Sequence, residues 1–393
     1  MTITVGTYLP PWGTDRSRTL GYDEDALTLA VEAGRRAIGA GSSATRVVFV
    51  SRDFPLLEGG NAAVLVAGLG LPNDTEVVER LGGAPETLDA LITATAGTLV
   101  IGAEAEGAAG AAAALIADEN LLSLAGRAQR SFPQRTRLVT GAVYRDENPR
   151  MLRELGIQAS LKEAALAAKP LLIAGLRAKE SAGLVVGKAP DLPTLGAASP
   201  LFAIAGLIET GGKGIIGACE QGTFVAANFA GGKAVVNRNE PQAQALPKRK
   251  LMPGGEIRIA LGAYARAFEA KVRWQAGRCK KCGKLAMPPR FHCLGCGADD
   301  SWEYTALPRA GKVYTTTTIQ VPVPSLASPY SLAVVELDGT DVRVLVHVTD
   351  SVPGSVKIDD VGRFVLRRVA MRTGVPDYGY AFSPVSGNPG GSK

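Results

Sequence analysis

Histidine is nearly absent from this chain: 393 residues hold only two, His292 and His347. The first 235 residues therefore lack imidazole, the side chain most often used as a general base near neutral pH. Long apolar runs are missing too, and no basic segment followed by an apolar one opens the chain. These absences argue against a membrane-spanning helix and a secretory signal, so we expect a cytoplasmic protein that does not contact membranes.

The composition is that of a globular protein with room for two or three domains, being 46% hydrophobic and 20% charged. The net charge is +6, from 43 basic and 37 acidic residues that are interspersed along the chain. Such a diffuse excess fits nucleic acid and an anionic carrier such as coenzyme A equally well. Charge alone therefore selects no partner.

Cysteine is also rare, but four of the five cysteines lie within one short segment. They are Cys279, Cys282, Cys293 and Cys296. Two Cys-x-x-Cys pairs with this spacing predict a closed four-thiolate zinc site, which is structural because no coordination position stays open. Gly283 and Gly297 follow the pairs, where a knuckle turn needs positive φ. A disulfide pair, four unrelated core thiols, or His292 as a competing ligand are the alternatives.

The chain is predicted to have six parts. Before residue 236, short apolar strands alternate with amphipathic helices in two similar series, which predicts a layered α/β domain. After the cysteines the hydrophobic period changes to two, as in a closed β structure. The expected parts are the α/β domain (1–236), a polar linker (237–256), a helix (257–274), the zinc ribbon (275–305), an all-β barrel (306–385) and a disordered tail (386–393).

Several motifs after residue 255 occur together in a known family. They are the four cysteines and segments 311–318, 329–330, 333–337 and 380–382. They resemble the zinc-ribbon/OB-fold family that accompanies acyl-CoA thiolases. The resemblance implies a non-catalytic partner that organises thiolase-type enzymes and helps to hold acyl-CoA. An OB-fold barrel alone also suggests oligonucleotide binding, but its expected strands show little basic and aromatic interleaving, so nucleic acid is disfavoured.

The α/β part carries a second resemblance. Its motifs are segments 6–10, 23–38, 59–63, 81–83, 107–115 and 196–200. They resemble the thiolase superfamily, closest to hydroxymethylglutaryl-CoA synthase and its relatives, which implies two βαβαβαββ halves. In that family we expect subunits to pair through the strand after the nucleophile helix. Residues 98–102 take that place here and are apolar.

The same resemblance implies that the catalytic groups are gone. The family's cysteine nucleophile begins a helix whose positive terminus lowers the thiol pKa, but this sequence places Ala84 there. Ala174 and Gly175 stand where the family has its histidine, and Leu195 replaces an asparagine. We therefore expect no catalytic residue in this chain.

The remaining cysteine, one histidine and three aromatic residues are also candidates for functional roles. Cys219 ends an expected strand with no histidine to activate it, so we expect a core thiol rather than a relocated nucleophile. His347 is expected to be a hydrogen-bonded barrel residue rather than a base. Tyr314, Tyr330 and Phe382 are expected in the barrel core, or alternatively on a surface facing an acyl chain.

Three functions follow from these patterns. The first is an accessory subunit that binds zinc and assembles with a catalytic thiolase-like subunit, with a coenzyme A thioester as ligand or as the partner's substrate. The second is an autonomous acyl-CoA acyltransferase that uses an unorthodox residue such as Cys219 or His347. The third is an OB-fold nucleic-acid-binding or scaffold protein.

Overall fold

The computed structural model describes residues 3–39, 43–118, 121–138, 140–146, 148–253, 258–321 and 326–385. The expected tail (386–393) and residue 257, where a helix was expected to begin, lie outside these ranges. The chain forms two compact units. The first unit is Met1–Thr19, Leu29–Ala62 and Leu71–Gln244; the second is Leu20–Thr28, Ala63–Gly70 and Ala245–Lys393. Two segments of the expected first domain thus belong to the second unit.

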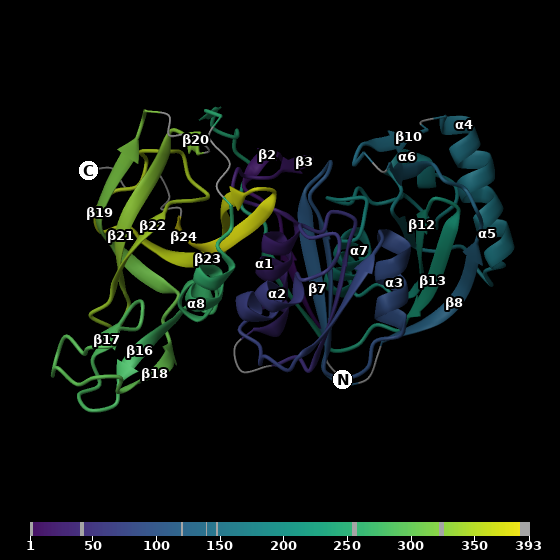
Figure 1. The fold of residues 1–393 in the computed structure, drawn as a ribbon. Coiled ribbons are helices and arrows are strands. Elements are labelled where there is room, and N and C mark those ends of the chain that lie inside the picture. The colour runs from purple at the N-terminus through teal and green to yellow at the C-terminus, as the bar shows by residue number, and fades with distance from the viewer. Residues whose placement is uncertain are drawn as a thin grey trace, which may run out of the picture. The chain divides into compact units, whose positions relative to one another are not determined.

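A mixed six-stranded sheet forms one side of the first unit (Figure 1). Its strands are β1 (Ile3–Tyr8), β4 (Arg46–Ser51), β5 (Glu76–Leu81), β6 (Thr98–Glu104), β7 (Gly110–Ile116) and β14 (Ala234–Asn239). Their order is β14-β1-β7-β6-β4-β5. Strand β7 is antiparallel to β1 and β6, whereas β4 is parallel to β5 and β6.

A second sheet repeats this arrangement. Its strands are β8 (Leu122–Gln129), β11 (Leu172–Ala174), β12 (Gly214–Glu220) and β13 (Thr223–Phe229), in the order β11-β12-β13-β8. Strand β13 is antiparallel to both neighbours, as β7 is in the first sheet. The strands of the two sheets therefore correspond in pairs: β8 to β1, β11 to β4, β12 to β6, and β13 to β7. Within the described residues, β5 has no counterpart, so the expected duplication is present with one half shortened.

Two helices lie between the sheets, α3 (Ala84–Ile92) and α7 (Ser199–Thr210). Both contribute to one apolar core with residues of both sheets. Small residues permit close approach here: a Cβ on Gly102 of β6 would overlap the backbone at Ala197, just before α7. A larger residue at position 102 would therefore push β6 away from the start of α7.

The remaining elements of the first unit are short, apart from α1. They are β2 (Trp12–Thr14), β3 (Ser17–Thr19), α1 (Ala26–Ile38, whose first turn lies in the second unit), β9 (Arg135–Arg137), β10 (Val143–Arg145), α4 (Pro149–Met151), a π-helix (Leu152–Gln158), α5 (Ala159–Ala164) and α6 (Ala178–Ser181). The last three helices before β11 follow one another without a break from Pro149 to Ala164.

The expectation that residues 98–102 form the strand through which subunits pair is wrong. Residues 98–102 lie in β6, which pairs with β4 on one side and β7 on the other. Both rows of its backbone groups are therefore already hydrogen-bonded, and its side chains are buried. The edges of this sheet are β14 and β5, and the sequence pattern did not predict β5 as a strand.

The second unit contains helices α2 (Ala62–Leu69) and α8 (Leu261–Lys271) and the zinc-ribbon sheet. That sheet has the order β17-β16-β18, with β16 (Gln275–Cys279), β17 (Leu285–Ala286) and β18 (Trp302–Ala306). A two-residue strand, β15 (Lys250–Leu251), pairs with β20 (Ala327–Ser328). Helix α8 is shorter than the expected 257–274.

Five strands form an OB-fold barrel in the second unit. They are β19 (Ala310–Ile319), β21 (Tyr330–Leu337), β22 (Arg343–His347), β23 (Val361–Arg372) and β24 (Val375–Pro384). Their order is β22-β21-β19-β23-β24, and a parallel bridge between Val348 and Phe382 closes the two ends. The alternating apolar pattern after residue 306 thus produces the predicted closed barrel.

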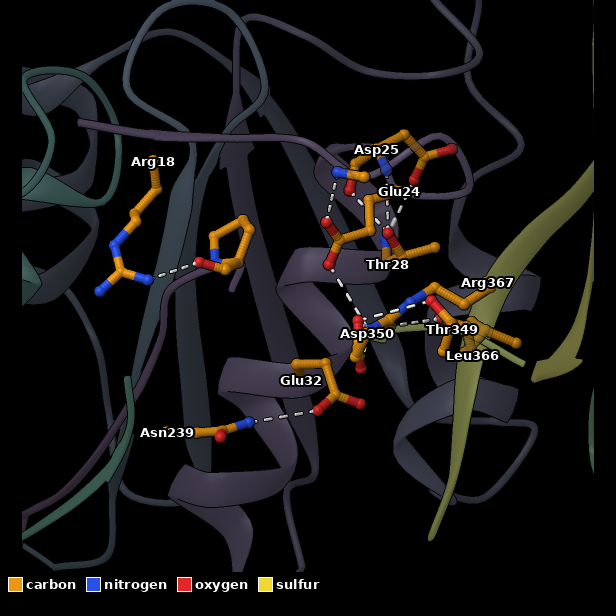
Figure 2. Close-up of polar contacts among 12 residues, drawn as sticks. Arg18, Glu24, Asp25, Thr28, Glu32, Asn239, Thr349, Asp350, Leu366 and Arg367 are labelled. Atoms are coloured by element: carbon orange, nitrogen blue, oxygen red, sulfur yellow. Dashed lines mark hydrogen bonds and ion pairs between the residues drawn. The ribbon is translucent and has the colours of Figure 1, made fainter. Parts of the chain in front are cut away.

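A buried ionic cluster joins the start of α1 to the barrel within the second unit (Figure 2). Arg367 and Glu24 are both fully buried, and Arg367 Nη2 lies 3.5 Å from Glu24 Oε1. The same nitrogen donates to both carboxylate oxygens of Asp350, at 3.0 and 2.9 Å. The Tyr378 hydroxyl donates to Asp25 Oδ2 at 2.8 Å. An acidic segment from early in the chain is therefore part of the barrel's interior.

Within the described part of the chain, no helix combines the length and the apolar character needed to cross a bilayer.

Candidate functional site

The four predicted metal ligands converge at one end of the ribbon. All four Sγ atoms lie within 4.8 Å of one another. Cys279 Sγ is 3.8 Å from Cys296 Sγ, and Cys282 Sγ is 3.5 Å from Cys293 Sγ. A tetrahedral zinc ion with bonds of about 2.3 Å requires sulfur atoms about 3.8 Å apart. The cluster is therefore compatible with structural zinc, and four thiolates complete the coordination.

The two knuckles have the same backbone geometry. Gly283 N donates to Cys279 O at 2.8 Å, and Gly297 N donates to Cys293 O at 2.9 Å. The φ angles of the two glycines are +75° and +70°, as predicted for these turns. Backbone amides of Cys296 and then Gly295 point at Cys293 Sγ and lower its pKa to about 6. The turn thus favours the thiolate form that a metal binds.

The two histidines lie elsewhere. His292 Nδ1 is hydrogen-bonded to the exposed Asp299 carboxylate, and His292 is not a member of the cysteine cluster. The His347 ring packs against Tyr330, with ring centroids 5.1 Å apart, and burial lowers its pKa. Neither histidine belongs to the first unit.

One barrel aromatic differs from the prediction. Tyr330 and Phe382 are buried, but Tyr314 is 52% exposed, so the prediction that it packs in the core is wrong. The Arg343 guanidinium covers the Tyr314 ring at 3.7 Å. Tyr314 follows the buried Val313 in the alternation of β19, so its side chain lies on the outer face of the barrel, and the surface alternative is the one that stays open.

The degenerate catalytic positions come together in the first unit. Ala84 is the first residue of α3 and is fully buried. A Cβ added to Gly175 would lie 3.2 Å from Ala84 Cβ, so the positions implied for the nucleophile and the histidine adjoin. The Cys219 carbonyl packs against the same glycine. The structure thus brings together two positions that the thiolase resemblance singles out.

Cys219 is 2% exposed, and burial raises the pKa of its thiol to about 12. Because the thiolate is the nucleophilic form, a thiol this weakly acidic is a poor nucleophile near neutral pH. Its surroundings are apolar and include Phe224 and Ala226. This environment favours the expected role as a core thiol.

Sequence reasoning missed a group of charged residues beside this buried site. Arg52, after β4, forms an ion pair with Glu220 at the end of β12. Glu104 at the end of β6 accepts hydrogen bonds from Gly196 N at 2.6 Å and Ala198 N at 3.1 Å. A small polar cleft lies alongside. Its lining is Arg52, Asp53, Glu104, Glu106, Arg135, Arg145, Gly196 and Ala197. The available signal was that two corresponding strands both end in glutamate.

Comparison with known proteins places the second unit in a family. Residues 304–366 match the family model described as the C-terminal OB-fold domain of ChsH2. A DUF35 domain-containing scaffold protein of Methanocaldococcus jannaschii is 33% identical over 112 residues, which are 28% of this chain and 79% of that protein. The chain belongs to the DUF35 family. A second relative is the benzoylsuccinyl-CoA thiolase subunit BbsA of Geobacter metallireducens. It is 30% identical to this DUF35 protein over 110 residues, which are 28% of this chain and 73% of that protein.

The first unit of this DUF35 protein is thiolase-like, as its duplicated sheets and paired central helices indicate. Among solved structures, a 3-oxoacyl-(acyl-carrier-protein) synthase III is similar over 57% of this chain and 97% of that one, with 13% identity and a TM-score of 0.46. The chain therefore joins a thiolase-like unit to an OB-fold unit, with a four-cysteine cluster of the kind that zinc ribbons use.

Proposed function

We propose that this chain is a non-catalytic accessory subunit of a thiolase-type complex that makes or breaks carbon–carbon bonds in acyl-CoA. The observation that carries the proposal is the composition of the buried site at the start of α3. Ala84 occupies the nucleophile position, Gly175 adjoins it where a histidine is expected, and the first unit contains no histidine. Alanine cannot be acylated, so the chemistry has to come from another subunit.

The names of the relatives support this role. One is called a scaffold protein and the other a thiolase subunit. Each of them matches about 110 residues, a length that suits the DUF35 part alone. In our proposal the thiolase-like unit adds a contact surface for a catalytic partner of similar fold. The acyl-CoA is then the partner's substrate, and the assembly acts in the cytoplasm.

The surface proposed for the partner is the free edge of β5. The first sheet ends at this strand, so one row of its backbone N–H and C=O groups is available for pairing. Leu81 at its end is 71% exposed, and Val77 and Val78 are only half-buried. An exposed edge with apolar side chains favours addition of a strand from another chain.

We also propose that the four cysteines bind one zinc ion that holds the ribbon. The Sγ separations and the two matched knuckle turns support this. With four thiolate ligands the ion has no site for substrate, and its contribution is to the folding of the ribbon.

The first test asks whether the chain forms an acyl-enzyme. Purified protein is incubated with acetyl-CoA or acetoacetyl-CoA and then analysed by intact mass spectrometry. We expect no covalent adduct, because neither Ala84 nor the buried Cys219 can accept the acyl group. An acyl group on Cys219 would favour an autonomous enzyme instead.

The second test concerns the partner. Affinity-tagged chain expressed in its own host should co-purify with a thiolase that carries the missing cysteine and histidine. Leu81→Lys should abolish co-purification, because it places a charge on the edge strand. Leu57→Lys is the matched control, since Leu57 is 62% exposed but lies outside β5. If the thiolase is absent at moderate salt, or if both substitutions act alike, the proposal fails.

A further inference from the structure

The two halves of the first unit each end one central strand in glutamate. Strands β6 and β12 occupy corresponding places in the two sheets, and each has seven residues. Glu104 is the last residue of β6 and Glu220 the last of β12. Each strand then reverses into an antiparallel neighbour. The two carboxylates are therefore related by the internal duplication of the fold.

Glu104 lies at the N-terminal end of α7, a helix of the other half. Its two carboxylate oxygens accept from Gly196 N at 2.6 Å and Ala198 N at 3.1 Å. These amides lie just before the helix, where the macrodipole favours negative charge. A Cβ on Gly196 would lie 2.7 Å from Glu104 Cδ, so the glycine makes room for this contact.

Glu220 lies beside the start of α3, where the Gly83 amide itself donates to Glu86 Oε2 at 2.9 Å. A Cβ on Gly83, the residue before Ala84, would overlap both Glu220 Oε2 and Arg52 Nη2, which pair with each other. Arg52 is also attracted to Glu104. One arginine thus lies between two carboxylates, and each carboxylate reaches the end of a helix from the opposite half.

We propose that Glu104, Arg52 and Glu220 form a clamp that joins the two halves and keeps Ala84 enclosed between them. The clamp places the chain's own charges at both helix ends, where an incoming anionic or thioester group would otherwise bind. It is a property of the isolated chain and does not depend on a catalytic partner. Its failure is therefore distinguishable from failure of the proposed function.

The test measures access to position 84 with a reporter thiol. Ala84→Cys introduces the reporter, and Leu81→Cys, at a site 71% exposed, gives the rate for an accessible thiol. Both proteins are labelled with N-ethylmaleimide, and the modified peptide is quantified by mass spectrometry at the high-pH plateau, where the thiol is ionised in each variant. We expect the Ala84→Cys thiol to react roughly 100-fold more slowly, because it needs local opening.

Removing the clamp should then expose the reporter. Adding Glu220→Ala to Ala84→Cys should raise its labelling rate at least about tenfold, because opening no longer breaks an ion pair. The matched control is Glu209→Ala, which removes the exposed carboxylate paired with Arg238 and should leave the rate unchanged. Equal rates with Glu220→Ala and Glu209→Ala, or fast labelling with the clamp intact, would overturn the proposal.

A second measurement avoids the reporter. In hydrogen exchange of the otherwise unmodified chain, Glu220→Ala should accelerate exchange in peptides covering α3, and Glu104→Ala in peptides covering the start of α7. Glu209→Ala should change neither region. Unchanged protection in both clamp variants would show that these residues do not hold the halves together.

Discussion

Substitution of Arg367 by methionine should strongly destabilise the second unit. Methionine retains much of the side-chain length but removes the guanidinium, which donates twice to Asp350 and lies 3.5 Å from Glu24. Although burial opposes ionisation of Asp350, the Arg367 charge holds its pKa below the usual value. The substitution therefore leaves two buried carboxylates without their main counter-charge.

The expected loss is about 3–5 kcal/mol, the range for breaking a buried ion pair from one side. With a urea dependence of about 2 kcal/mol/M, the unfolding midpoint should fall by roughly 2 M. Trp274 reports on this unit because its ring is buried 4.8 Å from Phe364 and 4.9 Å from Tyr380. Its fluorescence during urea unfolding is the assay.

Arg343→Met is the matched control, because Arg343 pairs with Glu336 on the exposed face of the same barrel. It should lower the unfolding midpoint far less than Arg367→Met does, because solvent screens an exposed ion pair. Combining Arg367→Met with Asp350→Asn and Glu24→Gln should recover part of the loss, since no buried charge is then left unpaired and asparagine tolerates the φ of +55° at position 350. If Arg367→Met costs no more than Arg343→Met, the buried cluster contributes little and the reasoning is refuted.

Three further predictions concern the metal site and pH. Cys282→Ser should reduce bound zinc from about one per chain to well below that, measured by elemental analysis, because three thiolates bind it less tightly. Gly297→Val should weaken zinc retention against a chelator, since φ is +70° there and valine is strained by about 1–3 kcal/mol. Burial raises the Glu104 pKa to about 7, so the folded state retains a proton that the unfolded state loses near pH 4.5. Stability of the first unit should therefore increase as pH falls from 8 to 5, by up to about 3 kcal/mol, and Glu104→Gln should flatten this dependence in urea unfolding.

Local patterns predicted the metal cluster and the barrel well. The cysteine spacing located the ribbon because a knuckle involves only a few consecutive residues and a glycine turn. The period-two pattern after residue 306 located the barrel strands, since burial on one face imposes alternation. The role of Ala84 was implied by the resemblance to the thiolase superfamily, and the structure puts this residue at the start of α3.

Features that depend on distant contacts were missed. The pattern did not indicate β5 because a half-buried edge strand lacks a continuous apolar run. In the sequence, nothing distinguishes the three clamp residues, Arg52, Glu104 and Glu220, from ordinary charged residues at the ends of strands. Sequence alone does not show that Glu104 and Glu220 occupy corresponding positions in the two sheets. The strand orders of the two sheets show this, and each carboxylate contacts the opposite half of the unit.

The contacts of the acidic segment at the start of α1 determine when the second unit can finish folding during synthesis. Tyr378 follows its partner Asp25 by 353 positions. At about 5–20 residues per second, roughly 20–70 s pass between the synthesis of these two residues. During that interval Glu24 and Asp25 stay hydrated, because Arg367 and the last barrel strand do not yet exist. The second unit can therefore complete its fold only after β24 has left the ribosome. If synthesis stops before β24, the acidic segment lacks its partners and the barrel lacks its last strand.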